Sequence, residues 1–187
     1  FYMQRALRLA RRGERWVSPN PMVGAVIVKG DRIIGEGYHE HFGGLHAELN
    51  ALRQAQKPVR GATIYVTLEP CSHYGKTPPC AEVLIGLQLA RVVIGTADPN
   101  PLVAGRGIAA LWRAGIDVTM GVMEQACREI NETFFKFITT GIPYVTLKFA
   151  QTVDGRIASV TGHSRWISSP SSRTFAHRLR STHDAIL

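Results

Sequence analysis

The apolar positions of residues 2–38 change period along the chain. Residues 2–12 place apolar side chains at helical spacing, which predicts an amphipathic helix. Residues 23–28 (VGAVIV) and 33–38 (IIGEGY) are apolar runs separated by a KGDR turn. Two such runs around a short turn predict an antiparallel hairpin.

Helical and extended patterns then alternate as far as Thr140. Helices are expected at about 46–55, from Pro79 onward, at about 108–114 and at about 123–139. Strands are expected at 62–70, 91–98 and 116–121. A hairpin followed by alternating strands and helices predicts a layered α/β sandwich on a mixed sheet.

A different pattern begins after the TGIP segment at residues 140–143. A strand is expected over 143–158 with a DG turn, then a helix in 168–181 with a serine cap and Pro170 in its first turn, and a strand at 183–187. We therefore expect domains at 1–141 and 142–187. About 46 residues ending on an apolar strand are too few for a stable domain, so the second is expected to be the beginning of a larger one.

Composition fits a folded protein that buries a core. The chain has 187 residues, 45% of them hydrophobic. No run approaches the roughly 18 apolar residues of a membrane span, and the first residues lack the features of a signal peptide, so a cytoplasmic protein without a membrane partner is expected.

The net charge of +8 raises the question of nucleic acid. The basic residues are nevertheless spread along the chain, and only RLARRGER, at residues 8–15, forms a cluster. At helical spacing its arginines are most simply a solvated face. Anionic small substrates suit the same excess, and no nucleic-acid partner is expected.

Cysteine usage points to metal more than to disulfides. There are three cysteines, an odd number too small for a disulfide framework. Cys127 sits at helical spacing among apolar residues and is expected to be a packed, inert thiol. Cys71 and Cys80 bracket the stretch SHYGKTPP and remain as candidate ligands.

A third ligand is available from His46, in the stretch HAE. An imidazole at a helix start and two thiolates that follow prolines suit Zn²⁺, and three protein ligands leave a fourth position for water. A structural zinc site normally needs a fourth protein ligand, for which His73 is the candidate. Without that ligand, the pattern favours a catalytic zinc.

Glu48 lies two residues after His46. A carboxylate near zinc that is not itself a ligand can move a proton from water to a leaving group. Taken alone, Glu48 would be explained as a first-turn glutamate favoured by the helix dipole. Beside a zinc site with an open position, the catalytic role is preferred.

These motifs resemble known families. HAE followed by EPC and a later cysteine is similar to the zinc-dependent nucleoside and nucleobase deaminases, whose signature is H-x-E and P-C-x-x-C, although eight residues separate the cysteines here. The stretches SPNPMVGAVIV, PCSHYGKTPPC and DPNPLVAGRG, in this order, closely resemble the bifunctional riboflavin-biosynthesis deaminase/reductases. LKFAQTVDGRIA and GHSRWIS resemble the start of their reductase domain.

The resemblance implies a cytidine-deaminase-like first domain that deaminates 2,5-diamino-6-ribosylamino-4(3H)-pyrimidinone 5′-phosphate. It also implies the start of a dihydrofolate-reductase-like domain that uses NADPH to reduce the ribosyl group to ribityl. A single zinc ion per deaminase domain and a homo-oligomer are expected. The 187-residue chain is expected to deaminate without reducing.

The resemblance also assigns residues. It gives His46, Cys71 and Cys80 as zinc ligands and Glu48 as the catalytic proton shuttle. The implied substrate contacts in the deaminase are Asn20, His73, Lys76, Asp98 and Asn100, with Lys76 near the phosphate. In the reductase the implied contacts are Lys148, Ser164 and Arg180 for substrate and Ala150 and Trp166 for the cofactor.

Simpler explanations stay open for several of these residues. Asn20 and Asn100 lie between prolines, where a turn would explain them, and Asp98 could cap its loop. Trp166 could be a core residue. Two other functions also stay open: a nucleic-acid or nucleoside deaminase with the same zinc chemistry, and a zinc-stabilised binding module with a fourth ligand.

Overall fold

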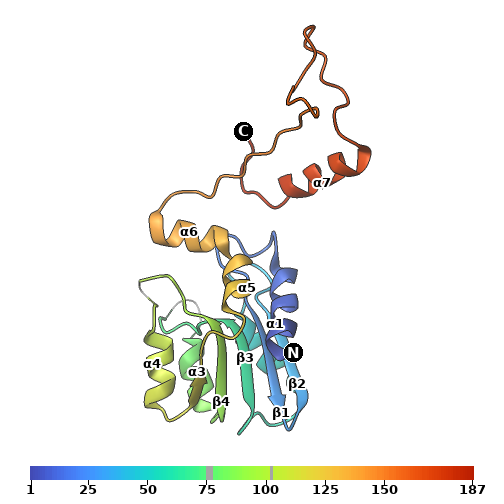
Figure 1. Cartoon of the computed structure of the whole chain (residues 1–187). Coiled ribbons are helices and arrows are strands. Elements are labelled where there is room, and N and C mark those ends of the chain that lie inside the picture. Colours follow the sequence, from blue (N-terminus) through green and yellow to red (C-terminus); the bar gives the residue numbers. More distant parts are fainter. Residues whose placement is uncertain (75–77, 102) are drawn as a thin grey trace. The chain divides into compact units, whose positions relative to one another are not determined.

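A computed structural model describes residues 1–74, 78–101 and 103–187 (Figure 1). The chain divides into two compact units, Phe1–Pro143 and Tyr144–Leu187. The expected division into domains 1–141 and 142–187 stays a prediction.

The first unit is built on a five-stranded sheet with the strand order β2-β1-β3-β4-β5. Its strands are β1 (Gly24–Lys29), β2 (Arg32–Tyr38), β3 (Thr63–Leu68), β4 (Arg91–Thr96) and β5 (Asp117–Thr119). β1 pairs antiparallel with β2 and with β3, whereas β3, β4 and β5 run parallel. The mixed sheet and the hairpin are therefore confirmed.

Helices cover both faces of this sheet (Figure 1). They are α1 (Tyr2–Ala10), α2 (Ala47–Arg53), α3 (Cys80–Gly86), α4 (Arg106–Arg113), α5 (Glu124–Glu129) and α6 (Glu132–Thr140). Buried residues of α2, α3 and α4 form one core with side chains such as Ile64 and Ile94. Buried residues of α1 and α5 form a second core with the opposite side chains of the strands, among them Val26 and Val93.

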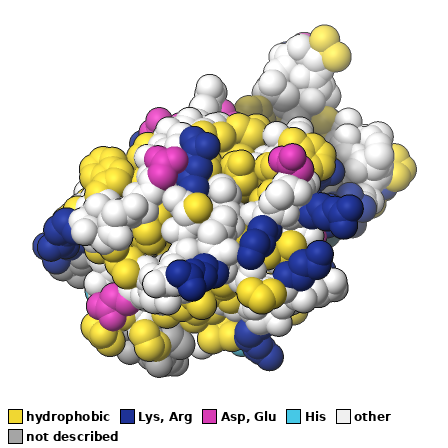
Figure 2. Space-filling model, turned by 90° about the horizontal axis from the view of Figure 1, so that it is seen from below, with side chains coloured by type: hydrophobic (Ala, Val, Ile, Leu, Met, Phe, Trp, Pro, Cys, Tyr) yellow, Lys and Arg dark blue, Asp and Glu magenta, His cyan; other side chains and the backbone are white. Residues whose placement is uncertain are grey.

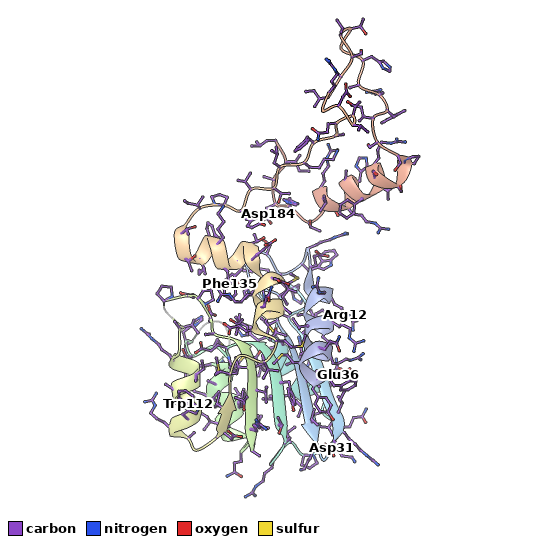
Figure 3. All side chains as sticks on the ribbon, in the orientation of Figure 1. Arg12, Asp31, Glu36, Trp112, Phe135 and Asp184 are labelled. Carbon is purple, nitrogen blue, oxygen red and sulfur yellow. The ribbon has the colours of Figure 1, made fainter. Side chains whose placement is uncertain are left out.

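The alternation along each strand produces this arrangement. Ile64 and Val66 of β3 face the α2–α4 core, whereas the intervening Tyr65 packs on the α1 side. Successive side chains of a strand point to opposite faces, so a strand covered on both faces reads as a continuous apolar run. Figure 3 shows side chains filling the space between the sheet and its helices, with Trp112 on the outer side of α4.

Two helix predictions need correction. The first helix ends at Ala10, and residues Arg11–Gly13 form a 3-10 turn. The prediction of one long helix over 123–139 is wrong, because α5 and α6 are separate helices with Asn131 between them. The Asn131 side chain accepts from the Met22 nitrogen at 2.7 Å and donates to the Met22 oxygen at 2.8 Å. Asn131 therefore binds the backbone of a distant loop and also directly precedes α6.

The second unit contains α7 (Pro170–Arg180) as the one helix or strand among its described residues. The Ser169 side chain accepts a hydrogen bond from the Ser172 nitrogen and Pro170 opens the helix, as predicted. The predictions of strands at 143–158 and 183–187 are wrong. A strand needs a partner for its backbone groups, and these segments have no ladder within the described residues of this unit.

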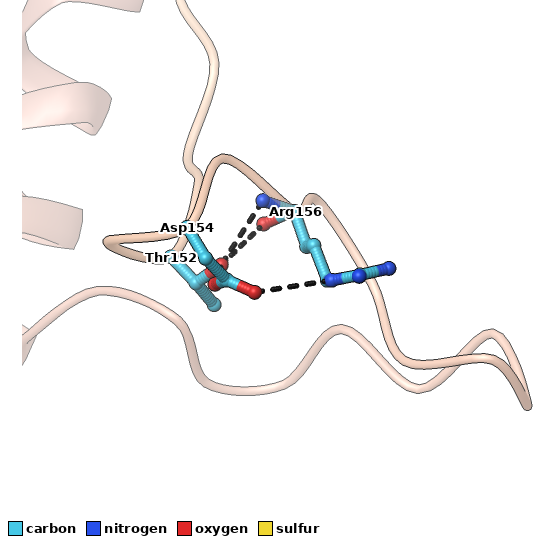
Figure 4. Close-up of polar contacts among 3 residues, drawn as sticks. All are labelled: Thr152, Asp154 and Arg156. Atoms are coloured by element: carbon cyan, nitrogen blue, oxygen red, sulfur yellow. Dashed lines mark hydrogen bonds and ion pairs between the residues drawn. The ribbon is translucent and has the colours of Figure 1, made fainter.

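The DG turn of the second unit is held by local polar contacts (Figure 4). Thr152 accepts from the Arg156 nitrogen at 3.0 Å, and Arg156 pairs with Asp154 through an Nε–Oδ2 distance of 3.0 Å. Apolar side chains at Val145, Leu147 and Phe149 are exposed. Local turns thus form here without a buried core.

Charged side chains are dispersed on one face of the protein (Figure 2). On the face shown in Figure 2, Lys and Arg side chains lie in separate small groups among apolar and uncharged atoms. One arginine of the RLARRGER cluster packs over an aromatic ring, with the Arg12 Cζ 4.8 Å from the centroid of Tyr38. None of the helices in the described residues has the length and hydropathy that crossing a membrane requires.

Candidate metal centre and its surroundings

His46 and Glu48 lie at the start of α2, where close packing against β2 fixes the position of the helix. A Cβ built on Gly37 of β2 would lie 2.2 Å from the Ala51 nitrogen, so only glycine permits this approach. His46 precedes α2 with extended backbone, φ −68° and ψ 160°. Glu48 is in the first turn, with 3% of its surface exposed.

Cys71 and Cys80 come from the other side of the site. Cys71 follows the carboxyl end of β3, and Cys80 is the first residue of α3, directly after Pro79. The Cys80 nitrogen donates to the Cys71 Sγ at 3.3 Å, and the Ala81 nitrogen donates to the Cys71 oxygen at 3.1 Å. The start of α3 thereby holds the two cysteines together across the intervening segment.

The ligand atoms of His46, Cys71 and Cys80 converge. The His46 Nδ1 lies 3.5 Å from the Cys71 Sγ and 3.4 Å from the Cys80 Sγ, and the three atoms lie within 4.8 Å of one another. Tetrahedral zinc with bonds of about 2.3 Å to sulfur and about 2.0 Å to nitrogen places adjacent ligand atoms about 3.5 Å apart. The spacing therefore suits one zinc ion.

Protonation within this cluster is strongly coupled. Interaction with the Cys80 side chain, opposed by burial and aided by His46, lowers the pKa of the Cys71 thiol to about 4. The hydrogen bond with Cys71 in turn raises the pKa of His46 to about 8, whereas Cys71 and burial raise the pKa of Cys80. One thiolate is favoured by the protein alone, and a cation is needed to stabilise the second.

Glu48 lies beside this cluster without a full set of partners. Its Oε2 atom is buried and has no hydrogen-bond partner among the described residues. Burial is the main cause that raises the pKa of Glu48 to about 7, and the positive charge of His46 opposes it. A carboxyl group with a pKa near neutrality and a free oxygen suits proton transfer.

His39 is a neighbour of the cluster that sequence reasoning missed. Its ring lies 5.6 Å from the ring of His46, and its nitrogens contact the Leu45 oxygen at 3.0 Å and the Asn20 Nδ2 at 3.1 Å. Burial lowers the pKa of His39. A neutral ring donates through Nδ1 to Leu45 and accepts through Nε2 from Asn20. The stretch YHEHF offered no signal to distinguish His39 from His41.

Asn20 is thus near the cluster and also part of a turn. Its nitrogen donates to the Val17 oxygen at 2.8 Å, which is the turn role that the flanking prolines suggested. The side-chain amide of Asn20 contacts His39, and the His39 ring in turn neighbours the His46 ring. The turn role is therefore observed for the backbone of Asn20, whereas a substrate contact of its side chain stays a prediction.

The remaining predicted deaminase contacts lie on two loops. Asp98 accepts from the Asn100 nitrogen at 2.8 Å, so the loop-capping explanation holds for Asp98. Burial raises the pKa of Asp98, and the nearby His73 opposes that effect. His73 is exposed and is not in the ligand cluster found among the described residues. Lys76 lies outside the described residues.

The reductase residues are spread over the second unit. Lys148, Ser164, Trp166 and Arg180 are exposed, and Ala150 is half-buried. Trp166 is 69% exposed, so core packing does not explain it in this chain. The Arg173 Cζ lies 4.1 Å from its ring centroid. Ser164 and Trp166 line a common hollow of about 480 Å³, and their roles stay predictions.

Comparison with protein families decides the membership of the chain. Residues 1–96 match the family described as the cytidine and deoxycytidylate deaminase zinc-binding region. The chain belongs to this zinc-binding deaminase family. The matched range contains the three candidate ligands, His46, Cys71 and Cys80, together with Glu48. Residues 143–187 match a second family, the RibD C-terminal domain.

Curated relatives of this chain are named riboflavin biosynthesis protein RibD. The chain is 53% identical to the Aquifex aeolicus protein over 186 residues and 52% identical to the Escherichia coli protein over 187 residues. These matches cover 100% of the chain but 52% and 51% of the relatives. The chain thus spans about half the length of the curated relatives it matches.

Solved structures agree with the fold. Acinetobacter baumannii RibD matches with a TM-score of 0.90 and 50% identity, over 97% of this chain and 51% of that chain. A deaminase/reductase from Thermotoga maritima matches with a TM-score of 0.91 and 47% identity, over 96% of this chain and 52% of that chain. The cytidine-deaminase-like fold is confirmed.

Proposed function

We propose that this chain carries the zinc-dependent deaminase activity of riboflavin biosynthesis. The substrate would be 2,5-diamino-6-ribosylamino-4(3H)-pyrimidinone 5′-phosphate, whose 2-amino group is released as ammonia. The observation that carries the proposal is the convergence of His46, Cys71 and Cys80 at zinc-like spacing, with the buried carboxyl group of Glu48 beside them.

His46, Cys71 and Cys80 would hold the zinc ion in this proposal. When bound, zinc supplies Lewis acidity, which makes water a nucleophile near neutral pH. Glu48 takes a proton from the attacking water and returns protons to the ring nitrogen and to the departing amine. A bond from carbon to the water oxygen replaces the carbon–nitrogen bond, and ammonia leaves.

The choice of substrate rests on relatives. The chain is similar over its full length to proteins named RibD. A more distant structure, 25% identical with a TM-score of 0.56, is an Aspergillus oryzae Rib2 deaminase in complex with DARIPP. The match to that structure covers 73% of this chain and 91% of that chain. Asn20, His73, Lys76, Asp98 and Asn100 are the proposed contacts.

The second unit would contribute to the reductase activity of a longer protein. Its match to the RibD C-terminal domain and the deaminase/reductase title of the Thermotoga structure support this assignment. NADPH would contact Ala150 and Trp166, whereas Lys148, Ser164 and Arg180 would contact the substrate. We also expect a homo-oligomer, which light scattering would reveal.

Ammonia release from three substrates tests the proposal. Purified 187-residue protein, loaded with zinc, is incubated with the pyrimidinone phosphate, with cytidine and with a structured RNA. We expect ammonia from the pyrimidinone phosphate alone, and none from the Glu48→Gln variant. Ammonia from cytidine or RNA instead would replace the proposal by the nucleoside or nucleic-acid alternative. Zinc binding without ammonia from any substrate would favour the binding module.

A further inference from the structure

Glu69 is a buried carboxylate that the zinc chemistry does not use. It directly follows β3, two residues before Cys71, and 3% of its surface is exposed. Its own nitrogen donates to the Thr96 oxygen at 2.9 Å, which extends the β3–β4 pairing by one bond. The Glu69 backbone is therefore fixed to the sheet.

The Glu69 side chain accepts four backbone hydrogen bonds. Oε2 accepts from the nitrogens of Asp98 at 3.2 Å and Gly105 at 3.0 Å. Oε1 accepts from the nitrogens of Gly107 at 3.0 Å and Ile108 at 3.3 Å. Two oxygens of one carboxylate are thus shared among four N–H groups from a segment more than 28 residues further along the chain.

Three of these donors lie at the start of α4. The residue before that helix is Gly105, which has no side chain to cap it. The first N–H groups of a helix lack partners within the helix, and a negative charge is favourable there. Glu69 supplies both the acceptors and the charge from the end of another strand.

The chain also approaches closely at this point. A Cβ built on Gly107 would lie 2.2 Å from the Pro70 oxygen and 3.3 Å from the Glu69 Oε1. Pro70 is the residue between Glu69 and Cys71. The start of α4 is therefore packed directly against the peptide that leads to a proposed zinc ligand.

We infer that Glu69 is a positioning residue for the deaminase, setting residues 98–101 and 103–108 relative to Cys71, a proposed metal ligand. The inference rests on the proposed function, because Asp98 and Asn100 on this segment are proposed substrate contacts. The Asp98 nitrogen donates to Glu69, and its Oδ1 accepts from the Asn100 nitrogen at 2.8 Å. One carboxylate thus holds this loop and the start of α4 beside the backbone that leads to Cys71.

The Glu69→Gln variant separates positioning from general stability. Glutamine keeps the shape but replaces one acceptor oxygen by an N–H donor, which faces two backbone N–H groups. The matched control is Leu111→Ala, which removes a fully buried side chain from the same helix and leaves the carboxylate intact. Both variants are prepared in the 187-residue chain with zinc.

We expect Glu69→Gln to raise KM for the pyrimidinone phosphate about tenfold, with kcat within about threefold and zinc content unchanged, since the change displaces binding groups by less than about 1 Å. Amide hydrogen exchange should accelerate at two of the four donors. These are Asp98 and Gly105 if the glutamine nitrogen takes the place of Oε2, or Gly107 and Ile108 if it takes the place of Oε1. Leu111→Ala should lower the melting temperature and leave KM unchanged.

Two results would overturn the inference. One is a Glu69→Gln protein whose KM equals that of the unaltered chain. Its loss of activity would then be explained by a smaller fraction of folded protein, as for Leu111→Ala. The other is unchanged exchange at all four amides. If the unaltered chain does not deaminate, the proposed function fails, and the exchange measurement alone decides whether Glu69 orders this segment.

Discussion

Replacing Glu48 by glutamine should stabilise the metal-free protein at alkaline pH, and it should greatly slow deamination by the zinc-loaded protein. Burial raises the pKa of Glu48 from an ordinary value of 4.5 to about 7. A carboxyl group whose pKa is higher in the folded state destabilises the fold when it ionises, so stability falls as pH rises from 4.5 to 7. Glutamine carries no charge and removes this cost.

The size of the effect follows from these two pKa values. At 1.36 kcal/mol per pH unit, the difference between 4.5 and about 7 corresponds to about 3 kcal/mol of unfolding free energy at pH 8, which is an upper limit. Little of that cost is present at pH 4.5. Bound zinc would offset the negative charge, so the difference should be measured after metal removal.

Urea unfolding at pH 5 and pH 8 measures the effect in the chain and in Glu48→Gln. The variant should gain stability relative to the unaltered chain at pH 8 and much less at pH 5. Exposed Glu14 provides the control, and Glu14→Gln should show no such gain. With zinc bound, Glu48→Gln should lose about 10²- to 10⁴-fold in kcat. A Glu48→Gln protein that is less stable at pH 8, or that deaminates at a near-normal rate, would refute this account of Glu48.

Three further predictions concern single side chains. Cys71→Ser and Cys80→Ser should each bind zinc more weakly, so that elemental analysis after dialysis finds less zinc than in Cys127→Ser, since Cys127 is buried in the opposite core; equal zinc in all three would contradict the ligand set. Lys76→Ala should weaken substrate binding by about 1.5 to 3 kcal/mol if a charged hydrogen bond to phosphate is lost; unchanged KM would exclude that role. The pKa of Glu36 is lowered chiefly by a hydrogen bond from an arginine of α1, so its stabilising contribution is present above its unfolded pKa and is lost as acid protonates it. Because the pair is partly exposed, Glu36→Gln should cost less than about 1 kcal/mol at pH 7 by thermal unfolding; a loss that persists at pH 3 would contradict the mechanism.

The features predictable from sequence were those set by local pattern. The hairpin of β1 and β2 follows from two apolar runs around a tight turn, and the α7 start follows from a serine followed by proline. The grouping of His46, Cys71 and Cys80 was predictable because imidazole and thiolate groups are specific ligands for zinc, and the structure brings the three side chains together. Their role as zinc ligands stays a prediction. Their convergence depends on α2 packing against Gly37, which the motif alone does not reveal.

Features that depend on distant contacts were missed. The break between α5 and α6 coincides with Asn131, whose side chain binds Met22, 109 positions away. Glu69 looks like one more residue of the EPC motif, yet its role comes from backbone groups 29 to 39 positions later. His39 likewise gains meaning only from its contacts with Asn20 and Leu45.

In the second unit, strands were predicted that the structure does not contain among its described residues. The alternation at Val145, Leu147 and Phe149 is typical of a strand, but a strand also needs a neighbour that supplies hydrogen bonds. Within the described residues of that unit no such pairing occurs, and the three side chains are exposed. Pattern alone predicts the tendency of a segment and not whether a partner is present.

X-ray absorption at the zinc edge of the zinc-loaded 187-residue chain tests the central claim most directly. The account predicts one zinc per chain with two sulfur neighbours at about 2.3 Å and nitrogen or oxygen neighbours at about 2.0 Å, because Cys71, Cys80 and His46 leave one position for water. The Cys71→Ser protein should lose one sulfur neighbour or lose the metal. Zinc surrounded by oxygen and nitrogen alone, or an unchanged spectrum in Cys71→Ser, would contradict it.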